Sequence, residues 1–127
     1  MIKDILNHKS VHSFSINDNG NCVLSLSGGY NLSTECLVRF IGGNNFICNS
    51  DHGQKFGLAV PFNAESKINE AIAKQQVTDI KFDNYTGDLE IYFPTGILQI
   101  ICNSAGYENY QLNGPDELLI VVHGGKQ

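Results

Sequence analysis

DIKFDNYTGDLEIYFPTGILQIICNSAGYENYQLNGPDELLIVVHGGKQ, residues 79–127, is a run of short apolar segments separated by turn-forming residues. The segments either alternate between apolar and polar residues or are apolar throughout, and both patterns are typical of strands. They are DIKFD, LEIYF, ILQIIC, YQL and LLIVVH. The stretch therefore predicts an antiparallel meander. Its ILQIIC and LLIVVH segments are apolar on both faces, which favours central positions in a sheet.

The residues before this stretch predict further strands and one clear helix. Residues 18–21, Asp-Asn-Gly-Asn, favour a tight hairpin, because Asn and Gly accept the positive φ angles of its turn. Residues 34–41 alternate with apolar side chains on both faces, which predicts a strand covered on two sides. Asn63 is a suitable N-cap for an amphipathic helix that we expect to end near Gln76. Residues 2–9 also carry apolar residues at helical spacing.

These elements predict a single domain that spans residues 1–127. The expected fold is α+β and strand-rich, with an antiparallel sheet that forms a sandwich or open barrel of about eight strands. One amphipathic helix is expected to pack on this sheet. A chain of 127 residues with 42% hydrophobic residues is long and apolar enough to bury one core.

The chain is acidic, with a formal net charge of −5. Acids and bases cancel within residues 1–78, so the surplus lies in residues 79–127. This balance disfavours nucleic acid as a direct partner, because phosphate binding requires clustered Lys and Arg. It favours a basic partner, which an acidic surface attracts at long range. The N-terminal MIKDILNHK has no apolar run suited to a signal peptide, and no stretch is long enough to span a bilayer. We therefore expect a cytoplasmic protein without membrane contacts.

The sequence contains no motif that indicates catalysis, a metal or a cofactor, and we predict that the chain is not an enzyme. Its four cysteines lie in apolar surroundings without a C-x-x-C pair, so we expect buried, reduced thiols. Cys48 and His52 form a lone C-x-x-x-H, which lacks the second pair that structural zinc requires. Asp88 and Glu90 share one face of a strand, but such a pair on a wet face more often serves solubility than acid–base chemistry.

The most unusual local string is Gly-Tyr-Glu-Asn-Tyr at 106–110. We expect Tyr110 to fill a core position and Glu108 to tie the turn through backbone N–H groups. Tyr107 is the better candidate for exposure, and exposed tyrosines are enriched among interface hot spots. Arg39, the only arginine, is expected at the rim of a sheet, where its guanidinium reaches water or a surface carboxylate.

GDLEIYFPTGILQI (87–100), followed by GYENYQL (106–112) and a strand that ends in Gly124-Gly125, resembles a family of small bacterial domains. That family pairs a G-x-L-x-x-x-F-x-x-G-x-x-L hairpin with a Y-E-x-W-x-L strand. It is similar to the immunity proteins of polymorphic and contact-dependent growth-inhibition toxin systems. The likeness covers residues 79–125, and Tyr110 stands where the family usually has tryptophan. The resemblance implies a fold and no catalytic residue. Immunity proteins act by binding a cognate toxin and covering its active site.

The leading hypothesis is therefore an immunity protein, or antitoxin, that binds and neutralises a toxin domain. The expected toxin is a basic nuclease, because an acidic surface that imitates phosphate charge can cover its active site. The predicted partner-binding residues are acids and one tyrosine of the C-terminal half: Asp83, Asp88, Glu90, Tyr107, Glu108, Asp116 and Glu117. The alternative is a small-ligand binder that holds a lipid or metabolite in an apolar cavity of the barrel or sandwich.

Overall fold

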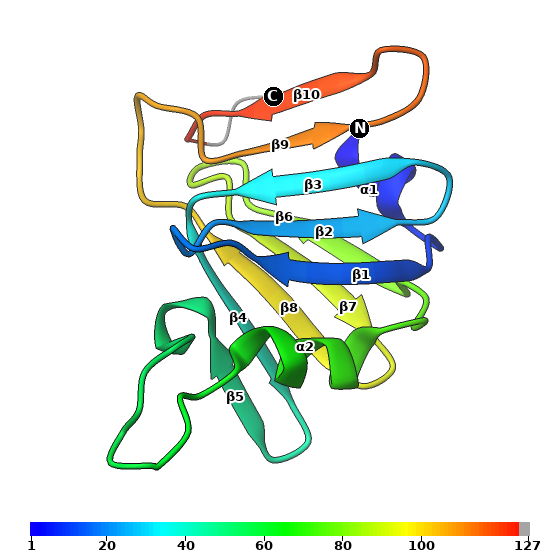
Figure 1. Ribbon diagram of the computed structural model, residues 1–127. Coiled ribbons are helices and arrows are strands. Elements are labelled where there is room, and N and C mark those ends of the chain that lie inside the picture. The colour runs from blue at the N-terminus through cyan, green and yellow to red at the C-terminus, as the bar shows by residue number, and fades with distance from the viewer. Residues whose placement is uncertain (125–127) are drawn as a thin grey trace.

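The computed structural model describes residues 1–124 and consists of two antiparallel sheets of five strands each, packed face to face (Figure 1). The first is named the β3 sheet after its central strand, and its order is β1 (Val11–Ile16), β2 (Cys22–Leu26), β3 (Tyr30–Thr34), β9 (Tyr110–Asn113), β10 (Leu119–Val122). The second is the β8 sheet, with the order β5 (Asn45–Cys48), β4 (Leu37–Gly42), β8 (Gly96–Ile101), β7 (Leu89–Phe93), β6 (Asp79–Phe82). The predicted strand-rich α+β fold is confirmed, as a sandwich.

An unbroken apolar row crosses the inner face of each sheet. In the β3 sheet the cross-strand partners are Phe14, Leu24, Leu32, Leu112 and Ile120. In the β8 sheet they are Ile47, Phe40, Leu98, Ile91 and Ile80. All of these side chains are buried, and burial of each stabilises the fold by about 1.5–3 kcal/mol. The rows also specify register, because a shift of one residue would turn a strand's apolar side chains to solvent.

The helix α2 (Ala64–Ile72) closes the β1 edge of the β3 sheet. Its Asn69 side chain accepts a hydrogen bond from Phe14 N at 2.9 Å and donates one to Phe14 O. Glu65 Oε1 accepts another from Ile16 N at 2.8 Å. These side chains take the place of a neighbouring strand, so the edge is not left open for pairing with another chain.

The predicted bounds of α2 are confirmed at its N-terminus and wrong at its C-terminus. The Asn63 side chain caps the first turn with a hydrogen bond of 2.9 Å, as predicted. The helix ends at Ile72, however, and not near Gln76. The reason is that Lys74 takes a positive φ of 65° and donates its N–H to Val11 O, so the chain leaves the helix to pair alongside β1.

The remaining helical elements of the described residues are two short segments. The helix α1 (Ile2–Leu6) packs against β6, and the 3-10 turn η1 (Asn49–Asp51) follows β5. Within residues 1–124, every helix is too short or too polar to cross a bilayer.

The single meander predicted for residues 79–127 is wrong in its second half. β6, β7 and β8 are neighbours in one sheet, but residues 102–109 then carry the chain to the other sheet, where β9 pairs with β3. The ILQIIC segment is central as β8, as predicted. The LLIVVH segment is instead the edge strand β10, and its Leu119 side chain is 57% exposed.

The strand β3 was not predicted, because YNLST carries one aliphatic residue, Leu32. The strand expected at 34–41 is β4, which begins three residues later and buries Val38 and Phe40 on its inner face. The prediction that both faces are covered is wrong, because the other face is the outer face of the sandwich, where Ile41 is 37% exposed. The described residues contain ten strands, more than the eight or so expected, and β3 accounts for part of the difference.

Candidate protein-binding surface

Five connections meet at one end of the sandwich, on the left in Figure 1. They are residues 17–21, 35–36, 83–88 and 102–109, together with 49–53, the first part of the connection from β5 to α2. They are tied to one another by hydrogen bonds. Asn49 Nδ2 donates to Gly20 O at 3.1 Å and to Cys36 O at 3.2 Å, and the Tyr110 hydroxyl donates to Gly87 O at 2.8 Å. We call this group of connections the acidic end.

Each of these five segments carries at least one carboxylate and no Lys or Arg, although Lys55 follows two residues after the 49–53 segment. The acids are Asp18, Glu35, Asp51, Asp83, Asp88 and Glu108. Asp51 and Asp88 are half-buried, and the other four are exposed. Like charges on one end sum to a field that raises the local concentration of a cationic partner. The acidic end can therefore steer a basic protein.

Two tyrosines project from the same end. Tyr85 in the 83–88 connection is 93% exposed, and Tyr107 in the 102–109 connection is 82% exposed, as predicted for Tyr107. A tyrosine ring offers a large, rigid contact area with a polar tip, and tyrosine is enriched in the anchors of protein interfaces. The acidic end thus combines steering charges with candidate anchors.

The 83–88 connection is held in shape by its own carboxylates. Asp83 Oδ1 accepts hydrogen bonds from Tyr85 N at 2.8 Å and Thr86 N at 3.0 Å. The backbone N–H groups of Thr86 and Tyr85 hold the pKa of the Asp83 carboxyl below its usual value. Asp88 Oδ1 accepts from Cys102 N at 2.8 Å, which links this connection to the next. These two acids therefore have a structural role.

The 102–109 connection is organised by Asn109, which is 2% exposed. Its Oδ1 accepts from Asn103 N at 3.2 Å and Ser104 N at 3.1 Å, and its Nδ2 donates to Ser104 O at 2.8 Å. The prediction that Glu108 ties this turn is wrong, because Glu108 is exposed and the neighbouring amide makes the bonds. Tyr110 fills a core position, as predicted, and is 2% exposed.

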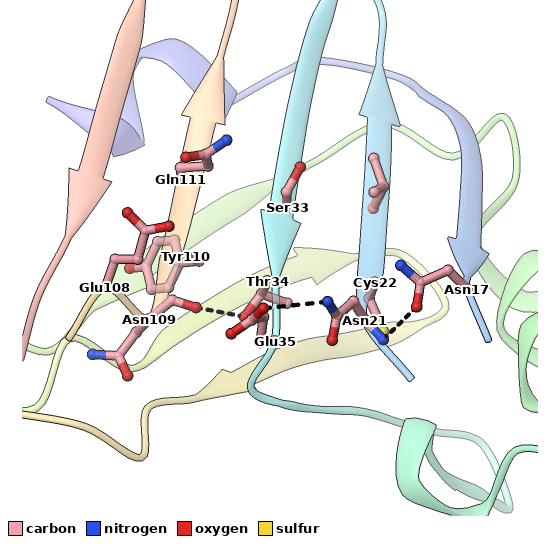
Figure 2. Close-up of a pocket in the computed structure, with 11 residues that line it drawn as sticks. Asn17, Asn21, Cys22, Ser33, Thr34, Glu35, Glu108, Asn109, Tyr110 and Gln111 are labelled. Carbon is pink, nitrogen blue, oxygen red and sulfur yellow. Dashed lines mark hydrogen bonds between the residues drawn. The ribbon is translucent and has the colours of Figure 1, made fainter. Parts of the chain in front are cut away.

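A depression of about 240 Å³ lies where the outer face of the β3 sheet meets the acidic end. Figure 2 shows Glu108, Glu35 and Asn21 side by side along the ends of β9, β3 and β2. Glu35 Oε1 accepts a hydrogen bond of 3.4 Å from Asn21 Nδ2, and Ser33 and Gln111 line the floor. Two carboxylates beside neutral polar groups form a suitable binding site for one Lys or Arg side chain.

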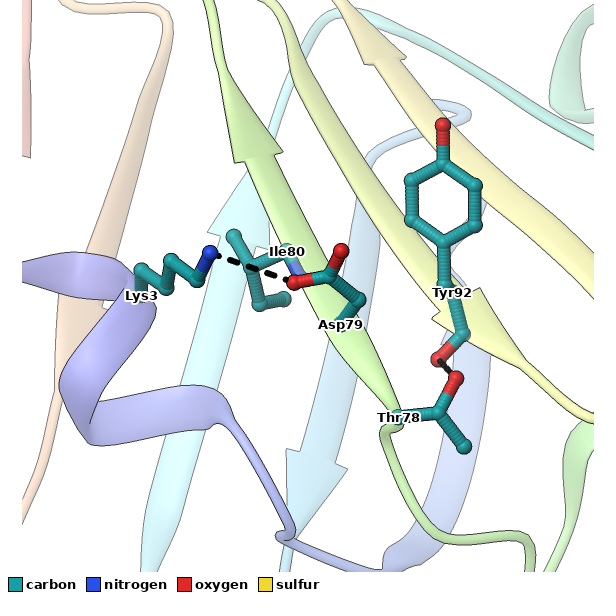
Figure 3. A network of polar contacts seen from close by, with 5 residues as sticks. All are labelled: Lys3, Thr78, Asp79, Ile80 and Tyr92. Atoms are coloured by element: carbon teal, nitrogen blue, oxygen red, sulfur yellow. Dashed lines mark hydrogen bonds and ion pairs between the residues drawn. The ribbon is translucent and has the colours of Figure 1, made fainter.

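Two acids elsewhere in the described chain form ion pairs with lysines. Lys3 Nζ lies 3.3 Å from Asp79 Oδ1, where α1 packs against the start of β6 (Figure 3). The Ile80 backbone N–H, and after it Lys3, lower the pKa of the Asp79 carboxyl. A second ion pair joins Lys67 and Glu70 on α2 at 3.9 Å. Neither pair lies at the acidic end, whose charge therefore stays uncompensated by these contacts.

The structure divides the seven predicted partner-binding residues among three places. Asp83, Asp88, Tyr107 and Glu108 lie at the acidic end. Glu90 lies on the outer face of the β8 sheet, where it accepts hydrogen bonds from Gln99 and from the Tyr92 hydroxyl at 2.7 and 3.1 Å. The remaining two lie in the turn between β9 and β10 at the opposite end, with positive φ angles: Asp116 and Glu117. The seven residues do not form one face.

Sequence reasoning missed Asp18, Glu35, Asp51 and Tyr85. The three acids were treated as neutralised because residues 1–78 contain as many bases, but those bases lie outside the five segments of the acidic end. A signal was present in the sequence, since each of these three acids has only Asn, Thr, Cys, Ser or His as its direct neighbours and never Lys or Arg.

Arg39 lies on the outer face of the β8 sheet, on β4, one strand in from the edge strand β5 and not at the rim. It belongs to a polar cross-strand row, in the order Cys48, Arg39, Gln99, Glu90, Lys81. Its Nε donates to Gln99 Oε1, so its partner is an amide and not a carboxylate. Opposite charges alternate along this row, so this face attracts a charged partner less than the acidic end does.

The cysteines and histidines do not assemble a metal site within residues 1–124, where no group of three or more His, Cys, Asp or Glu side chains could hold an ion. Cys22 and Cys36 are buried, as predicted, whereas Cys48 and Cys102 are only half-buried, and all four are free thiols. His52 Nδ1 accepts a hydrogen bond from Ala64 N at 3.0 Å and so supports the start of α2.

The interior leaves little space for a small ligand. A void between the sheets, beside Phe14, Val38 and Leu98, measures about 10 Å³. That is about the space of one water molecule, far below what a lipid or metabolite needs.

No protein-family model, no curated protein sequence and no solved structure matches this chain. The resemblance to immunity proteins therefore stays a prediction from the sequence, and the geometry of the acidic end is the basis for a functional proposal.

Proposed function

We propose that this chain is an immunity protein that binds a basic bacterial toxin domain, a nuclease, and blocks its active site without catalysing a reaction. One observation carries the proposal: six carboxylates and two exposed tyrosines gather at one end, on five segments that contain no Lys or Arg. A nuclease active site presents cations to phosphate, so an acidic surface is complementary to it. The sequence resemblance favours the same class of protein.

Charge and shape have separate roles in this binding. The exposed carboxylates raise the association rate with a cationic partner. The depression bounded by Glu35 and Glu108 accepts a Lys or Arg side chain between two carboxylates. Tyr85 and Tyr107 add contact area that loses little conformational entropy on binding.

The acidic end is also organised before binding. Asp83, Asp88 and Asn109 fix the backbone of two of its connections through hydrogen bonds. A surface that is already ordered loses less entropy on association, so more of the contact energy remains as affinity.

The proposal is tested with the toxin domain encoded beside the gene for this chain. Cells that express that domain should survive when the chain is co-expressed, and the purified chain should inhibit the nuclease with a one-to-one endpoint. The double variant Glu35→Lys/Glu108→Lys should lose protection. The matched control Asp116→Lys/Glu117→Lys reverses two acids at the opposite end and should protect as well as the unmodified chain.

Equal folded yield and thermal stability of both double variants separate a binding defect from a folding defect. Loss of protection by both variants, or by neither, would overturn the assignment to the acidic end. Failure of the unmodified chain to bind or inhibit the toxin domain would overturn the proposed function itself.

A further inference from the structure

Cys36 and Cys102 face one another across two neighbouring strands of the β8 sheet. Leu37 of β4 and Ile101 of β8 are the last paired residues of the ladder. Cys36 precedes Leu37 and Cys102 follows Ile101, so the antiparallel register places the two cysteines opposite one another. The Cys36 thiol also lies near Asn103, with Sγ 3.6 Å from Asn103 Oδ1.

The backbone makes this a pair without mutual hydrogen bonds. Cys36 N donates to Thr34 Oγ1 at 2.9 Å, and Cys102 N donates to Asp88 Oδ1 at 2.8 Å. Val38 N, two residues along β4, likewise points away from β8 and donates to Asn49 Oδ1 at 3.0 Å. Opposite residues in such pairs have Cα atoms about 4.5 Å apart, within the range of about 4.4–6.8 Å that a disulfide spans.

Both side chains lie on the inner face of their strands. Cys36 alternates with buried Val38, and Cys102 alternates with buried Ile100. Cys36 is 2% exposed, whereas Cys102 is half-buried and packs against the core. The pair therefore combines one fully buried cysteine with one that is partly exposed.

We propose that Cys36 and Cys102 are a modification site at which a low-molecular-weight disulfide, such as glutathione disulfide, forms an intramolecular disulfide across β4 and β8. The Cys102 thiolate attacks one sulfur of the reagent, which gives a mixed disulfide and releases one glutathione thiolate. Cys36 then attacks Cys102 Sγ and passes its proton to the departing thiolate, which leaves as the second glutathione. Two protein thiols are oxidised and one reagent disulfide is reduced to two thiols.

The surroundings make the first step slow at neutral pH and strongly pH-dependent. Burial, followed by the neighbouring Cys36 thiol and the Asp88 carboxylate, raises the pKa of Cys102 to about 12. The thiolate fraction, and with it the rate of the first step, should rise about tenfold for each unit of pH below that value. The second step is intramolecular between opposite side chains and should follow quickly.

The disulfide would change the acidic end. In the reduced protein the Cys36 thiol donates to Asn109 O at 3.3 Å, below the 102–109 connection. Oxidation removes this donor and fastens Cys102, the first residue of that connection, to Cys36, which directly precedes β4. It also closes a long loop of the chain, so we expect the melting temperature to rise by about 10 °C.

The test uses the double variant Cys22→Ser/Cys48→Ser, which retains only the two cysteines of the proposed site. The folded protein is incubated with glutathione disulfide near pH 7.5 and near pH 9, and followed by intact mass and peptide mapping. We expect loss of two hydrogen atoms, a peptide that links Cys36 to Cys102, faster reaction at the higher pH, and a higher melting temperature that dithiothreitol reverses. The variant Cys36→Ser should stop at one glutathione on Cys102.

A stable glutathione adduct on the double variant, in place of the internal disulfide, would overturn the proposal. So would the absence of reaction in the folded protein under conditions in which the urea-unfolded protein is oxidised. Both outcomes can be read from the double variant alone, so the test does not depend on whether Cys36→Ser folds.

Discussion

The two ends of the sandwich differ in how their connections are held. At the acidic end, side chains such as Asp83 and Asn109 bond to backbone N–H groups and shape connections of several residues. At the opposite end, the turns at 27–29 and 43–44 are short, and their glycines take positive φ angles. The connections of the acidic end are thus held in shape by polar side chains, and those of the opposite end by the conformation of the backbone.

The ends also differ in charge. In the connections of the opposite end, Asp116 and Glu117 are accompanied by Lys9 and Lys74, whereas the five segments of the acidic end contain six acids and neither Lys nor Arg. The acids of the acidic end therefore share one end of the strands, although the connections that carry them are far apart in the sequence. A count over residues 79–127 mixes the two ends, which is why it misplaced part of the predicted acidic surface.

The largest expected effect concerns the side chains that shape the acidic end. Asn109→Ala removes three hydrogen bonds of a buried amide and leaves two backbone N–H groups without that acceptor. We expect a loss of about 3 kcal/mol in the free energy of unfolding, measured by urea denaturation. The exposed Asn84→Ala at the same end should change it by less than about 0.5 kcal/mol. Equal effects of the two substitutions would contradict the role given to Asn109.

The opposite end should respond to steric changes instead. A Cβ at Gly42 would lie closer than van der Waals contact to Thr95 O and to Gly96 Cα. Gly42→Ala should therefore cost about 2 kcal/mol of stability, by the same denaturation measurement. Gly29→Ala meets no atom within 4 Å and is penalised only through its φ of 85°, so about 1 kcal/mol is expected. A smaller loss of stability for Gly42→Ala than for Gly29→Ala would contradict this prediction. It would mean that the backbone at Gly42 can move away from Thr95 and Gly96 without loss of stability.

The substitution Tyr107→Ala tests whether the acidic end contributes to binding of the toxin domain. The ring is 82% exposed, so its removal should leave the melting temperature unchanged while the affinity for the toxin domain falls about tenfold. Phe56, an aromatic residue 66% exposed in the loop before α2, is the matched control, and Phe56→Ala should leave the affinity unaltered. Isothermal titration calorimetry gives both values. A larger loss for Phe56→Ala would move the binding surface away from the acidic end.

The smallest effect is a pH dependence at the acidic end. The Asp83 pKa is lowered by the N–H groups of Thr86 and Tyr85, so the ionised form stabilises the fold. This contribution is present above the unfolded pKa of about 3.9 and disappears as pH falls through the lower folded value. Asp83→Asn should flatten the dependence of unfolding free energy on pH below about 4. An unchanged profile would mean that the Asp83 hydrogen bonds add nothing to stability.

Much of the fold could be predicted because local pattern and tertiary role agree. The alternation around Val38 and Phe40, and the Asn63 cap, indicate buried faces and a helix start that the structure confirms. β3 was missed because Leu32 is its only aliphatic residue, and its identity as a strand depends on pairing with β2 and β9. The placement of β9 and β10 in the other sheet likewise depends on long-range pairing.

The candidate site was only partly predictable for the same reason. Tyr107 and Glu108 stand out locally, and both lie at the acidic end. Asp18, Glu35 and Asp51 acquire meaning only when the sandwich brings their connections beside those of the C-terminal half. Burial of Asn109, and its hold on the 102–109 connection, also follow from the tertiary fold and not from the sequence around it.

The most direct measurement is the dissociation constant of the toxin domain at about 50 mM and about 300 mM NaCl for three proteins: the unmodified chain, Glu35→Lys/Glu108→Lys and Asp116→Lys/Glu117→Lys. Salt should weaken binding of the unmodified chain about tenfold, because exposed charges are screened. At the lower salt, reversal at the acidic end should weaken binding by about 100-fold and remove most of the salt dependence. Reversal at the opposite end should stay within about threefold of the unmodified chain. Equal losses from the two reversals would contradict the account.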